Sequence, residues 1–477
     1  MILLFGILLL LATFSTKMTN FLGIPGLVIF LGLGMLFGTG GLNVVSLDPL
    51  MAKQIATVLL IFILFEGGFS TKRSLLKVAF TPAFALATVG IIITALITGT
   101  LIHYALGLNI LFSLLIGSII SSTDAAAIFL LFRNKTIDKR IAATIEIESA
   151  SNDPMAIILT MFFIELIKGH MTSPTLMITN LIWQIIVGIL IGILVGKLAP
   201  VIFNRIRLET GGFYYVLILG ISLFSFGIAE LIGGNGFLAA FFAGFLIGNA
   251  EFVYKQSIFY FVEGFSTFCN VTLFLLLGSL IAPIDIVVYW KDGIIISLIL
   301  MFIARPVAVF ICTLLGKYNL REKLFICWGG IKGAVPIVLA TYPAAANLEN
   351  GSYVFKIVFF VVLTSALVQG PTLDFVAGKL NLLTNETRRS RYSMELISLE
   401  KSNTELIEVH VNNGCPLINK KLSEISIPQD TLIAAIVRND EIVTPRGNTE
   451  IQEYDTLFVL VPNRNKEELR SLFEEYA

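Results

Sequence analysis

The stretch ESASNDPMAI, residues 148–157, places two carboxylates, an asparagine and a proline inside the longer apolar run IAATIEIESASNDPMAIILTMFFIELI, residues 141–167. Ionisable groups are expensive in hydrocarbon, so each one inside such a run is a functional candidate. Helical periodicity puts Glu148 and Asn152 on one side, and Ser149 and Asp153 on the neighbouring side. Ser149 and Asp153 offer oxygen atoms to a hard cation, while Glu148 is free to pair elsewhere. We therefore predict an ion site at Ser149 and Asp153, and a structural role for the side of Glu148 and Asn152.

Two more apolar runs carry polar residues that fit a helix interior poorly. SSTDAAAIFLLFR, Ser121 to Arg133, contains three hydroxyls and Asp124. WGGIKGAVPIVLATYP, Trp328 to Pro343, contains three glycines, Lys332 and Pro336. Ser, Thr and Asp compete with helical hydrogen bonds, and Gly and Pro weaken them. Each run therefore predicts a locally unwound helix whose free backbone groups face a cavity, although a glycine-packed helix is the alternative for the second.

Arg305, in MFIARPVAVF, is the arginine that lies deep within an apolar run. A guanidinium there needs an anion, and Glu148 is the available one. A buried pair of this kind is more often scaffold than chemistry, because either charge alone would be heavily penalised. We predict a structural ion pair between Glu148 and Arg305.

The elements that position these residues are predicted to be membrane helices. The chain has 477 residues, of which 56% are hydrophobic and 14% charged, against about 25% charged in ordinary soluble proteins. With about 20 residues needed for each crossing, we predict an all-α polytopic membrane protein with 13 transmembrane helices. The candidate spans lie near 1–16, 22–42, 53–70, 78–103, 108–132, 141–167, 176–203, 212–232, 235–250, 256–282, 292–316, 322–345 and 353–380.

The fifth and twelfth spans hold the two unwound segments, and they are seven spans apart. Broken helices at matching positions of two halves indicate a transporter built from inverted repeats, with its binding site near the midplane. Basic residues then predict the orientation. They gather in alternate loops, such as the one around Arg133 and Lys139, and are sparse in the others. The positive-inside rule therefore places the N-terminus outside and the C-terminus in the cytoplasm.

After Leu380 the composition becomes polar, and from about residue 403 strand-like alternation follows in ELIEVHV, TLIAAIVR and DTLFVLVP. We predict a transmembrane domain over 1–382, a linker over 383–402 and a small cytoplasmic α/β domain over 403–477. The net charge is zero, so nothing points to nucleic acid as a partner.

The membrane region resembles monovalent cation/proton antiporters of the NhaP type, the electroneutral branch that includes the animal sodium/proton exchangers. ESASND matches the family's glutamate followed by Asn-Asp, and SSTDAAA its unwound Thr-Asp segment. ARP matches its membrane arginine, and GGIKGAVP its second broken helix. Lys332 departs from the pattern, since the family more often has Arg there.

This resemblance implies roles for named residues. Asp153 would bind K+ or Na+ and the proton, with Ser149, Thr123 and unwound backbone completing the shell. Asn152 would be the neutral neighbour typical of the electroneutral branch. Asp124 and Lys332 would balance the half-helix ends, and Glu66, in LLIFILFEGGF, would lie near the ion site.

The C-terminal region resembles the RCK C-subdomain, or TrkA-C type, without a nucleotide-binding N-subdomain. Such modules usually dimerise, and some sense a nucleotide such as cyclic di-AMP. The resemblance places Arg438, Asn439, Pro445 and Arg446 near the pocket, with a purely structural dimerisation role as the alternative. It also favours potassium as the substrate, because these modules accompany potassium transport systems.

We therefore expect a K+/H+ antiporter of the cell (inner) membrane, surrounded by lipid, homodimeric and without a resident cofactor, rather than an enzyme. Na+/H+ exchange is the alternative. Two other functions fit the sequence less well. An intramembrane aspartyl protease could use Asp124 and Asp153, but the sequence has no GxGD-like segment. An RCK-gated potassium channel would need a TVGYG-like filter, which the sequence also lacks.

Overall fold

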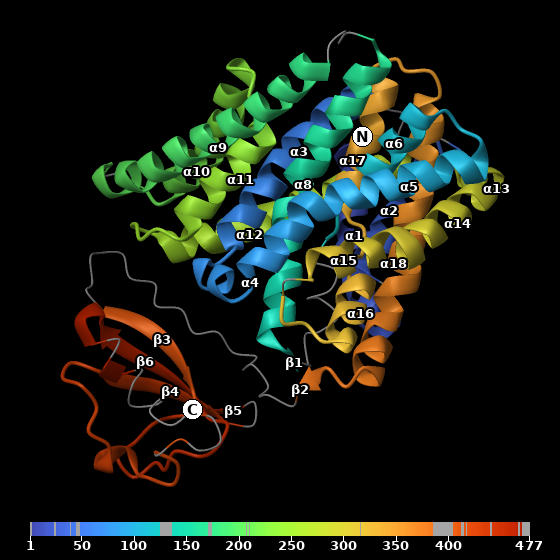
Figure 1. The fold of residues 1–477 in the computed structure, drawn as a ribbon. Coiled ribbons are helices and arrows are strands. Elements are labelled where there is room, and N and C mark those ends of the chain that lie inside the picture. The colour runs from blue at the N-terminus through green and yellow to red at the C-terminus, as the bar shows by residue number, and fades with distance from the viewer. Residues whose placement is uncertain are drawn as a thin grey trace. The chain divides into compact units, whose positions relative to one another are not determined.

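The computed structural model describes residues 2–22, 25–38, 40–43, 48–124, 136–169, 174–206, 208, 210–314, 316–384, 404–411, 415, 417–438, 441–465 and 468–469. The chain divides into two compact units (Figure 1). The first, here called the membrane unit, comprises residues 1–133 and 137–383. The second, the C-terminal unit, comprises 134–136 and 384–477.

Among the described residues, 8 helical segments are long and apolar enough to cross a membrane. Six are single helices: α3 (Pro49–Ser70), α8 (Lys139–Ile167), α9 (Pro174–Arg205), α10 (Gly212–Leu231), α12 (Lys255–Ser279) and α18 (Gly351–Lys379). The other two are composite rods, Arg73–Leu106 and Trp290–Cys312. The remaining helices are α1 (Ile2–Leu22), α2 (Gly26–Phe37), α6 (Ile110–Ile119), α11 (Gly236–Gly248), α13 (Pro283–Val288), α16 (Leu320–Trp328) and α17 (Ala334–Ala345). This arrangement is that of a helical multi-pass membrane protein.

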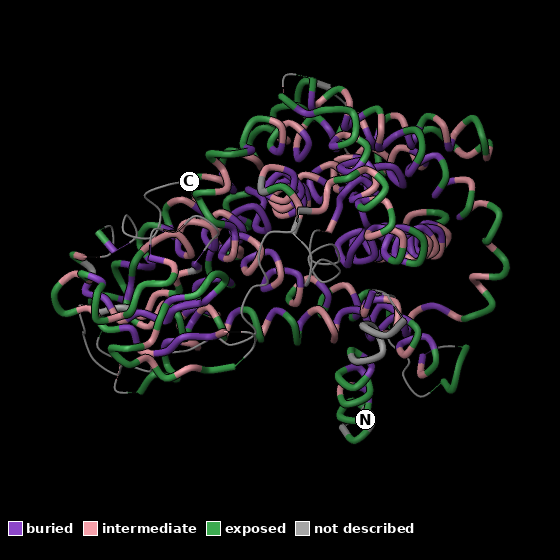
Figure 2. The backbone as a smooth tube through the Cα atoms, turned by 90° about the horizontal axis from the view of Figure 1, so that it is seen from below, coloured by how far each residue is buried: buried purple, intermediate pink, exposed green. Residues whose placement is uncertain are grey.

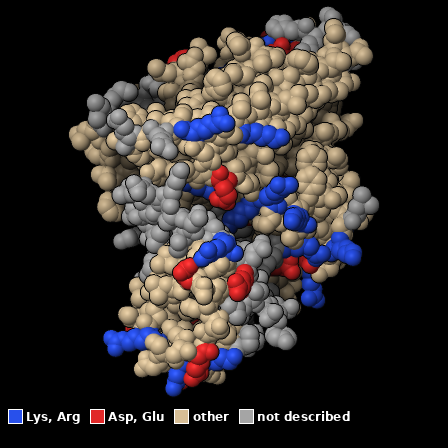
Figure 3. Space-filling view, turned by 90° about the vertical axis from the view of Figure 1, so that its left-hand side faces the viewer, with Lys and Arg blue, Asp and Glu red and all other residues tan. Residues whose placement is uncertain are grey.

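The outer surface of the membrane unit is apolar, as a lipid-facing surface must be. Helix α9 exposes Leu190, Leu194 and Leu198 along one face. Figure 2 shows buried residues on the inward sides of the helices and exposed ones on their outward sides. On the face seen in Figure 3, charged side chains of the membrane unit are sparse among uncharged surface.

Both composite rods contain a π-helical turn. The first runs through α4 (Arg73–Ala85), η1 (Leu86–Gly90) and α5 (Ile91–Leu106). The second runs through α14 (Trp290–Ile299), η2 (Leu300–Ala304) and α15 (Arg305–Cys312). Turns of this kind often occur at functional sites. The helix that follows each rod along the chain, α6 or α16, ends in a non-helical segment.

The two interruptions lie where the polar segments are. Helix α6 ends at Ile119 and residues 122–124 are not helical. The rest of the predicted fifth span, from residue 125, lies outside the described residues. In the second interruption, α16 ends at Trp328 and α17 begins at Ala334.

Glycines bring α3 and α11 into backbone contact. A Cβ atom added to Gly68, Gly244 or Gly248 would overlap the backbone of the facing helix. Helix α9 packs against α11 in the same way, since a Cβ on Gly192 would lie 2.7 Å from the carbonyl oxygen of Ala239. Small residues at helix interfaces allow this close approach in membranes. Helices α3, α9 and α11 thus form one tightly packed group, with α10 beside it (Figure 1).

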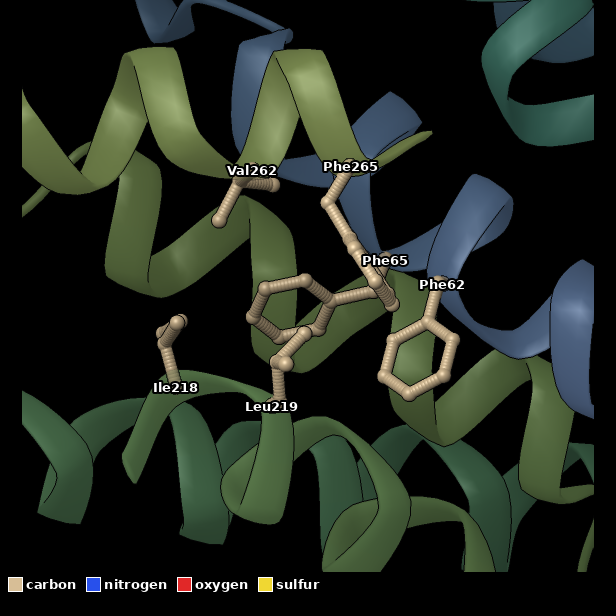
Figure 4. A pocket seen from close by; sticks show the side chains of 6 residues that line it. All are labelled: Phe62, Phe65, Ile218, Leu219, Val262 and Phe265. Atoms are coloured by element: carbon tan, nitrogen blue, oxygen red, sulfur yellow. The ribbon is translucent and has the colours of Figure 1, made fainter. Parts of the chain in front are cut away.

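A pocket of about 10 Å³ lies between α3, α10 and α12 (Figure 4). It is lined by Phe62, Phe65, Ile218, Leu219, Val262 and Phe265. A space of this size holds about one water molecule, and its lining side chains offer no polar partner. It is a packing gap rather than an ion site.

The C-terminal unit contains an antiparallel sheet with strand order β3-β6-β4-β5. Its strands are β3 (Thr404–His410), β4 (Leu432–Arg438), β5 (Glu441–Val443) and β6 (Thr456–Pro462), with short helices η3 (Leu422–Glu424) and η4 (Asn463–Asn465). Ile436, Leu457 and Val459 are fully buried in its core. The short strands β1 (Thr136–Ile137) and β2 (Leu383–Thr384) complete the elements. Most of the predicted linker, from residue 385, and residues 470–477 lie outside the described residues.

Candidate functional site

The non-helical segments that follow α6 and α16 meet through their backbones. The amide of Asp124, beyond the end of α6, donates a hydrogen bond of 2.8 Å to the carbonyl of Ile331. Ile331 lies between the end of α16 and the start of α17. A broken helix leaves backbone groups without helical partners, and this bond satisfies one group from each break. We call this region, residues 120–124 and 329–333, the crossing.

Lys332 balances the carboxyl end of α6. Its side chain is buried, and Nζ donates to the carbonyls of Ser121 at 3.2 Å and Ser122 at 2.9 Å. Carbonyls at the carboxyl end of a helix carry the partial negative charge of the helix dipole. The backbone amide of Lys332 donates to Ser365 Oγ at 3.1 Å, which fixes the segment on α18. The ammonium group therefore neutralises the first break.

Asp124 lies at the amino end of α17. Gly333 is the N-cap residue of that helix, and a Cβ added to it would lie 2.5 Å from Cβ and 2.8 Å from Cγ of Asp124. The amino end of a helix carries partial positive charge, which favours a carboxylate. The crossing thus places a lysine at the negative end of one half-helix and an aspartate at the positive end of the other.

We expect Gly333→Ala to abolish the predicted transport, because the added methyl group overlaps Asp124 and the crossing must open. Proton flux in vesicles measures the effect. The matched control is Gly227→Ala in α10, where an added Cβ meets nothing within 4 Å. That variant should gain about 0.5–1 kcal/mol of stability and keep full transport. Wild-type flux in Gly333→Ala would contradict the tight contact.

A buried hydroxyl and amide cluster joins α8 to the crossing. Thr123 Oγ1 and Ser149 Oγ share a hydrogen bond of 3.0 Å, and Asn152 Nδ2 donates to Thr123 Oγ1 at 2.7 Å. All three side chains are no more than 5% exposed. Within the described part of the chain, Oδ1 of Asn152 has no hydrogen-bond partner. An unpaired buried acceptor costs about 1–3 kcal/mol, so a cation or water at this cluster would be stabilised.

Asn152 does not pair with Glu148, although helical periodicity places both residues on one side of α8. Its amide bonds to Thr123 of the same cluster as Ser149, and not to the Glu148 side chain. Helical periodicity gives the direction in which a side chain leaves its own helix. The contacts of that side chain depend on which neighbouring segment lies against that face. Here the non-helical segment after α6 brings Thr123 within hydrogen-bond distance of both Ser149 and Asn152.

Asp153 follows this cluster on α8 and is half-buried. Asp124 and Lys332 are close enough to interact with it electrostatically. Pro154, the next residue, has no amide proton and therefore leaves a helical carbonyl free one turn earlier. The candidate residues Thr123, Asp124, Ser149, Asn152, Asp153 and Lys332 are thus gathered at the crossing.

Glu148 and Arg305 form a bidentate ion pair. Nη1 of Arg305 donates to Oε1 of Glu148, and Nη2 donates to Oε2 at 2.9 Å. Nη2 also donates to the carbonyl of Ile326 at 3.3 Å. Both side chains are buried, and Gly330 leaves room for the guanidinium, since a Cβ there would lie 2.6 Å from its Nε. The pair ties α8, α15 and α16 together beside the crossing.

Glu66 of α3 lies in a different set of contacts. Its carboxylate accepts hydrogen bonds from Ser70 at 2.5 Å and from Ser266 of α12 at 3.4 Å. Asp124 interacts with it electrostatically. The structure therefore holds Glu66 between α3 and α12 and within electrostatic reach of the crossing.

Sequence reasoning missed several residues that support the crossing. Ser365 holds Lys332, and it also donates to Gln369, which in turn donates to the carbonyl of Trp328. At the other end of α8, Nη2 of Arg140 donates to both carboxylate oxygens of Glu322, at 2.8 and 2.9 Å. A signal for the first pair was present, since Ser365 and Gln369 lie four residues apart in the apolar stretch of α18.

In the C-terminal unit, the predicted pocket residue Arg438 is already engaged. Its guanidinium donates to Asp455 at 2.9 and 2.8 Å, and to the carbonyl of Glu450 at 2.7 Å. Asp455 is fully buried. Pro445 is half-buried and Arg446 exposed, while Asn439 lies outside the described residues. The contacts of Arg438 hold the β4–β6 side of the sheet together.

We expect Arg438→Met to destabilise this sheet by about 1–3 kcal/mol, because the buried Asp455 loses its partner. The hydrogen bonds from Asp455 raise the pKa of the Arg438 guanidinium, so this stabilisation is present below the usual arginine pKa and is lost only as pH rises through the raised value. Hydrogen exchange in β4 and β6 of the full chain measures it. Arg464→Met, whose pair with Asp430 is exposed, should change exchange little. Equal effects would contradict the assignment.

Two family models match the chain. The model described as "Sodium/hydrogen exchanger, transmembrane" matches residues 6–379, and the TrkA-C domain matches residues 406–474. The first match contains every residue of the crossing. The second match contains strands β4, β5 and β6 and most of β3.

Similar proteins cover almost the whole chain. The K(+)/H(+) antiporter NhaP2 of Shewanella sp. (strain ANA-3) is 35% identical over 95% of this chain and 80% of its own length. The K(+)/H(+) antiporter NhaP of Alkalimonas amylolytica is 31% identical over 96% of this chain and 80% of its own.

Among solved structures, the sodium proton antiporter MjNhaP1 of Methanocaldococcus jannaschii at pH 8 superposes with a TM-score of 0.70 at 25% identity. The match covers 79% of this chain and 97% of the MjNhaP1 chain. The fold, the interrupted helices and these similarities lead to one conclusion: the chain belongs to the sodium/hydrogen exchanger family, in its NhaP-type branch, and carries a C-terminal TrkA-C domain.

Proposed function

We propose that this protein exchanges K+ for protons across the cell membrane, with Asp153 holding the two in turn. The observation that carries the proposal is the buried oxygen cluster of Thr123, Ser149 and Asn152 beside Asp153 at the crossing. Carboxylate, hydroxyl and amide oxygens are the ligands that hard cations prefer. Membership of a transporter family also excludes the intramembrane protease.

The exchange follows from competition for one carboxylate. A bare carboxylate is costly in a desolvated cavity, so Asp153 is stabilised either by a proton or by a cation. In either state the site carries the same charge, and one helix group then moves against the other. Because one proton replaces one cation, the exchange is electroneutral. Asp124 and Lys332 stay paired with the half-helix ends throughout.

Potassium is preferred to sodium because the relatives named K(+)/H(+) antiporters match nearly the full chain, TrkA-C domain included. Sodium is the second candidate. It is favoured by the similarity to the sodium proton antiporter MjNhaP1, which covers 79% of this chain.

The repeated interruptions support 13 membrane passages arranged as two inverted repeats. Each of the two composite rods contains a π turn, η1 in one and η2 in the other, and the helix that follows each rod, α6 or α16, ends in a non-helical segment. The same succession of elements in both halves is expected when the halves are structural repeats. The distribution of basic residues favours an outside N-terminus and a cytoplasmic TrkA-C domain.

We assign the TrkA-C domain a regulatory role in a homodimer, with a nucleotide such as cyclic di-AMP as the candidate ligand. Arg438 is paired with Asp455. A ligand would therefore be recognised by other groups around β5, or would have to displace that pair.

The test is proton movement in vesicles that contain the purified protein and a pH-sensitive dye. We expect K+ to collapse an imposed pH gradient at lower concentrations than Na+. With K+ on both sides, valinomycin should leave the rate unchanged, because electroneutral exchange does not build up a membrane potential. A response to Na+ without a response to K+ would overturn the substrate assignment.

A further inference from the structure

A cavity of about 450 Å³ approaches the crossing from the carboxyl end of α8. It is lined by α8 from Ile157 to Glu165, and by residues of α3, α9, α10, α11 and α17. Ile157 is one helical turn beyond Asp153 and shares its face. The cavity therefore ends one turn from the proposed ion site, and we call it the vestibule. By the proposed orientation, it lies on the outer side.

The vestibule contains charges of both signs. Glu165 and Glu230 are part of its lining, and so is Lys53 of α3. Carboxylates in a cleft raise the local concentration of cations, whereas a fixed ammonium group lowers it. The lysine is therefore the unexpected member of a path that must admit a cation.

Lys53 is held above an aromatic ring. Its Nζ lies 4.5 Å from the ring centroid of Tyr342 on α17, within the range of a cation–π contact. The hydroxyl of Tyr342 shares a hydrogen bond of 3.4 Å with Thr57 Oγ1. Lys53 and Thr57 are four residues apart and thus on one face of α3. One face of α3 therefore holds the ring of Tyr342 at two points.

This contact connects the two parts that must move in the exchange. Helix α17 begins at the crossing, and Tyr342 lies about two turns further along it. Helix α3 belongs to the group packed through Gly68, Gly244 and Gly248. The side chains of Lys53, Thr57 and Tyr342 therefore join the group of α3, α9 and α11 to the helix that carries half of the crossing.

From these contacts we propose that Lys53 is a tethered competitor of the transported monovalent cation, held on the ring face of Tyr342 at the vestibule, and that it sets the apparent affinity from this side. The inference rests on the proposed exchange function. An incoming cation would pass the carboxylates that line the vestibule, and the aromatic face that the ammonium group covers, on its way to Asp153.

The test is the KM for K+ added on the vestibule side of vesicles with uniformly oriented protein. We expect Lys53→Met to lower that KM by at least about threefold, because the competing charge is gone while the side-chain length is kept. Lys53→Arg, which keeps the charge and the ring contact, should retain the wild-type KM. Lys291→Met is the matched control: its Nζ lies 5.8 Å from the Trp290 ring centroid, yet Lys291 is not among the residues that line the vestibule. It should leave the KM unchanged.

A double-mutant cycle tests the role of the ring. In a Tyr342→Leu background, Lys53→Met should change the KM by less than about twofold, because the lysine is no longer held in the path. An unchanged KM in Lys53→Met, an equal effect of Lys291→Met, or a full effect of Lys53→Met without the ring would overturn the inference. Absence of cation-dependent proton flux in the wild-type protein would instead count against the proposed function. Melting temperatures of all variants identify any that fail to fold.

Discussion

Asp153→Asn is expected to reduce cation-dependent proton flux to the level of protein-free vesicles. The amide has nearly the same shape as the carboxyl group, so Thr123, Ser149 and Asn152 should keep their hydrogen bonds. What the amide cannot do is release a proton or neutralise a cation. Both loaded states that the exchange requires are therefore lost together. The loss should be the same at every pH and with K+ or Na+.

The control for this variant is Asp292→Asn. Asp292 lies in α14 and accepts a hydrogen bond of 2.9 Å from the hydroxyl of Tyr353, which an amide oxygen can still accept. Asp292→Asn should therefore transport normally. Melting curves in detergent should be similar for both variants. Wild-type exchange in Asp153→Asn would show that another group carries the proton and would refute the mechanism.

The second large effect is expected from breaking the pair of Glu148 and Arg305. Both residues are at most 5% exposed, so either single change leaves a buried charge without its partner. Glu148→Gln or Arg305→Met should each cost about 3–5 kcal/mol of stability. Thermal unfolding of the purified protein in detergent would show this as a marked fall in melting temperature, with transport lost as the crossing loosens.

Changing both partners separates ion pairing from packing. The double variant Glu148→Met/Arg305→Met should be more stable than either single variant, because no unpaired charge is left in the core. Lys255→Met is the comparison for an exposed pair: its partner Glu251 is 87% exposed, so its effect should be within about 1 kcal/mol. If Glu148→Gln and Arg305→Met each reduce the stability no more than Lys255→Met does, the pair of Glu148 and Arg305 is not a structural element of the core.

The interrupted helices were predictable because their composition conflicts with a regular helix in hydrocarbon. Ser121 to Asp124, and the glycines around Lys332, stand in otherwise apolar runs, and the structure has non-helical segments in both places. The pairing of Arg305 with Glu148 was predictable for the same kind of reason. A buried charge needs a counter-charge, and few candidates are available in such a chain.

The contacts of Lys332 and Asn152 were not derivable from local sequence. Lys332 bonds to carbonyls more than 200 residues away along the chain, and backbone carbonyls leave no mark in a sequence. Asn152 shares a helix face with Glu148, yet its amide reaches Thr123. The π turns η1 and η2 were also missed, since their residues are as apolar as those of the neighbouring α-helical turns.

By itself, then, the sequence indicated which segments are apolar enough to enter a membrane, where polar residues disturb them and which ionisable groups lie within them. These properties follow from the cost of transferring each residue into hydrocarbon, which depends on local composition. Only the tertiary structure decided that Lys332 lies on the end of α6, that Thr123 joins Asn152 to Ser149, and that Lys53 lies over Tyr342. Each of these contacts joins segments far apart in the chain, so it depends on how whole helices pack rather than on any local pattern.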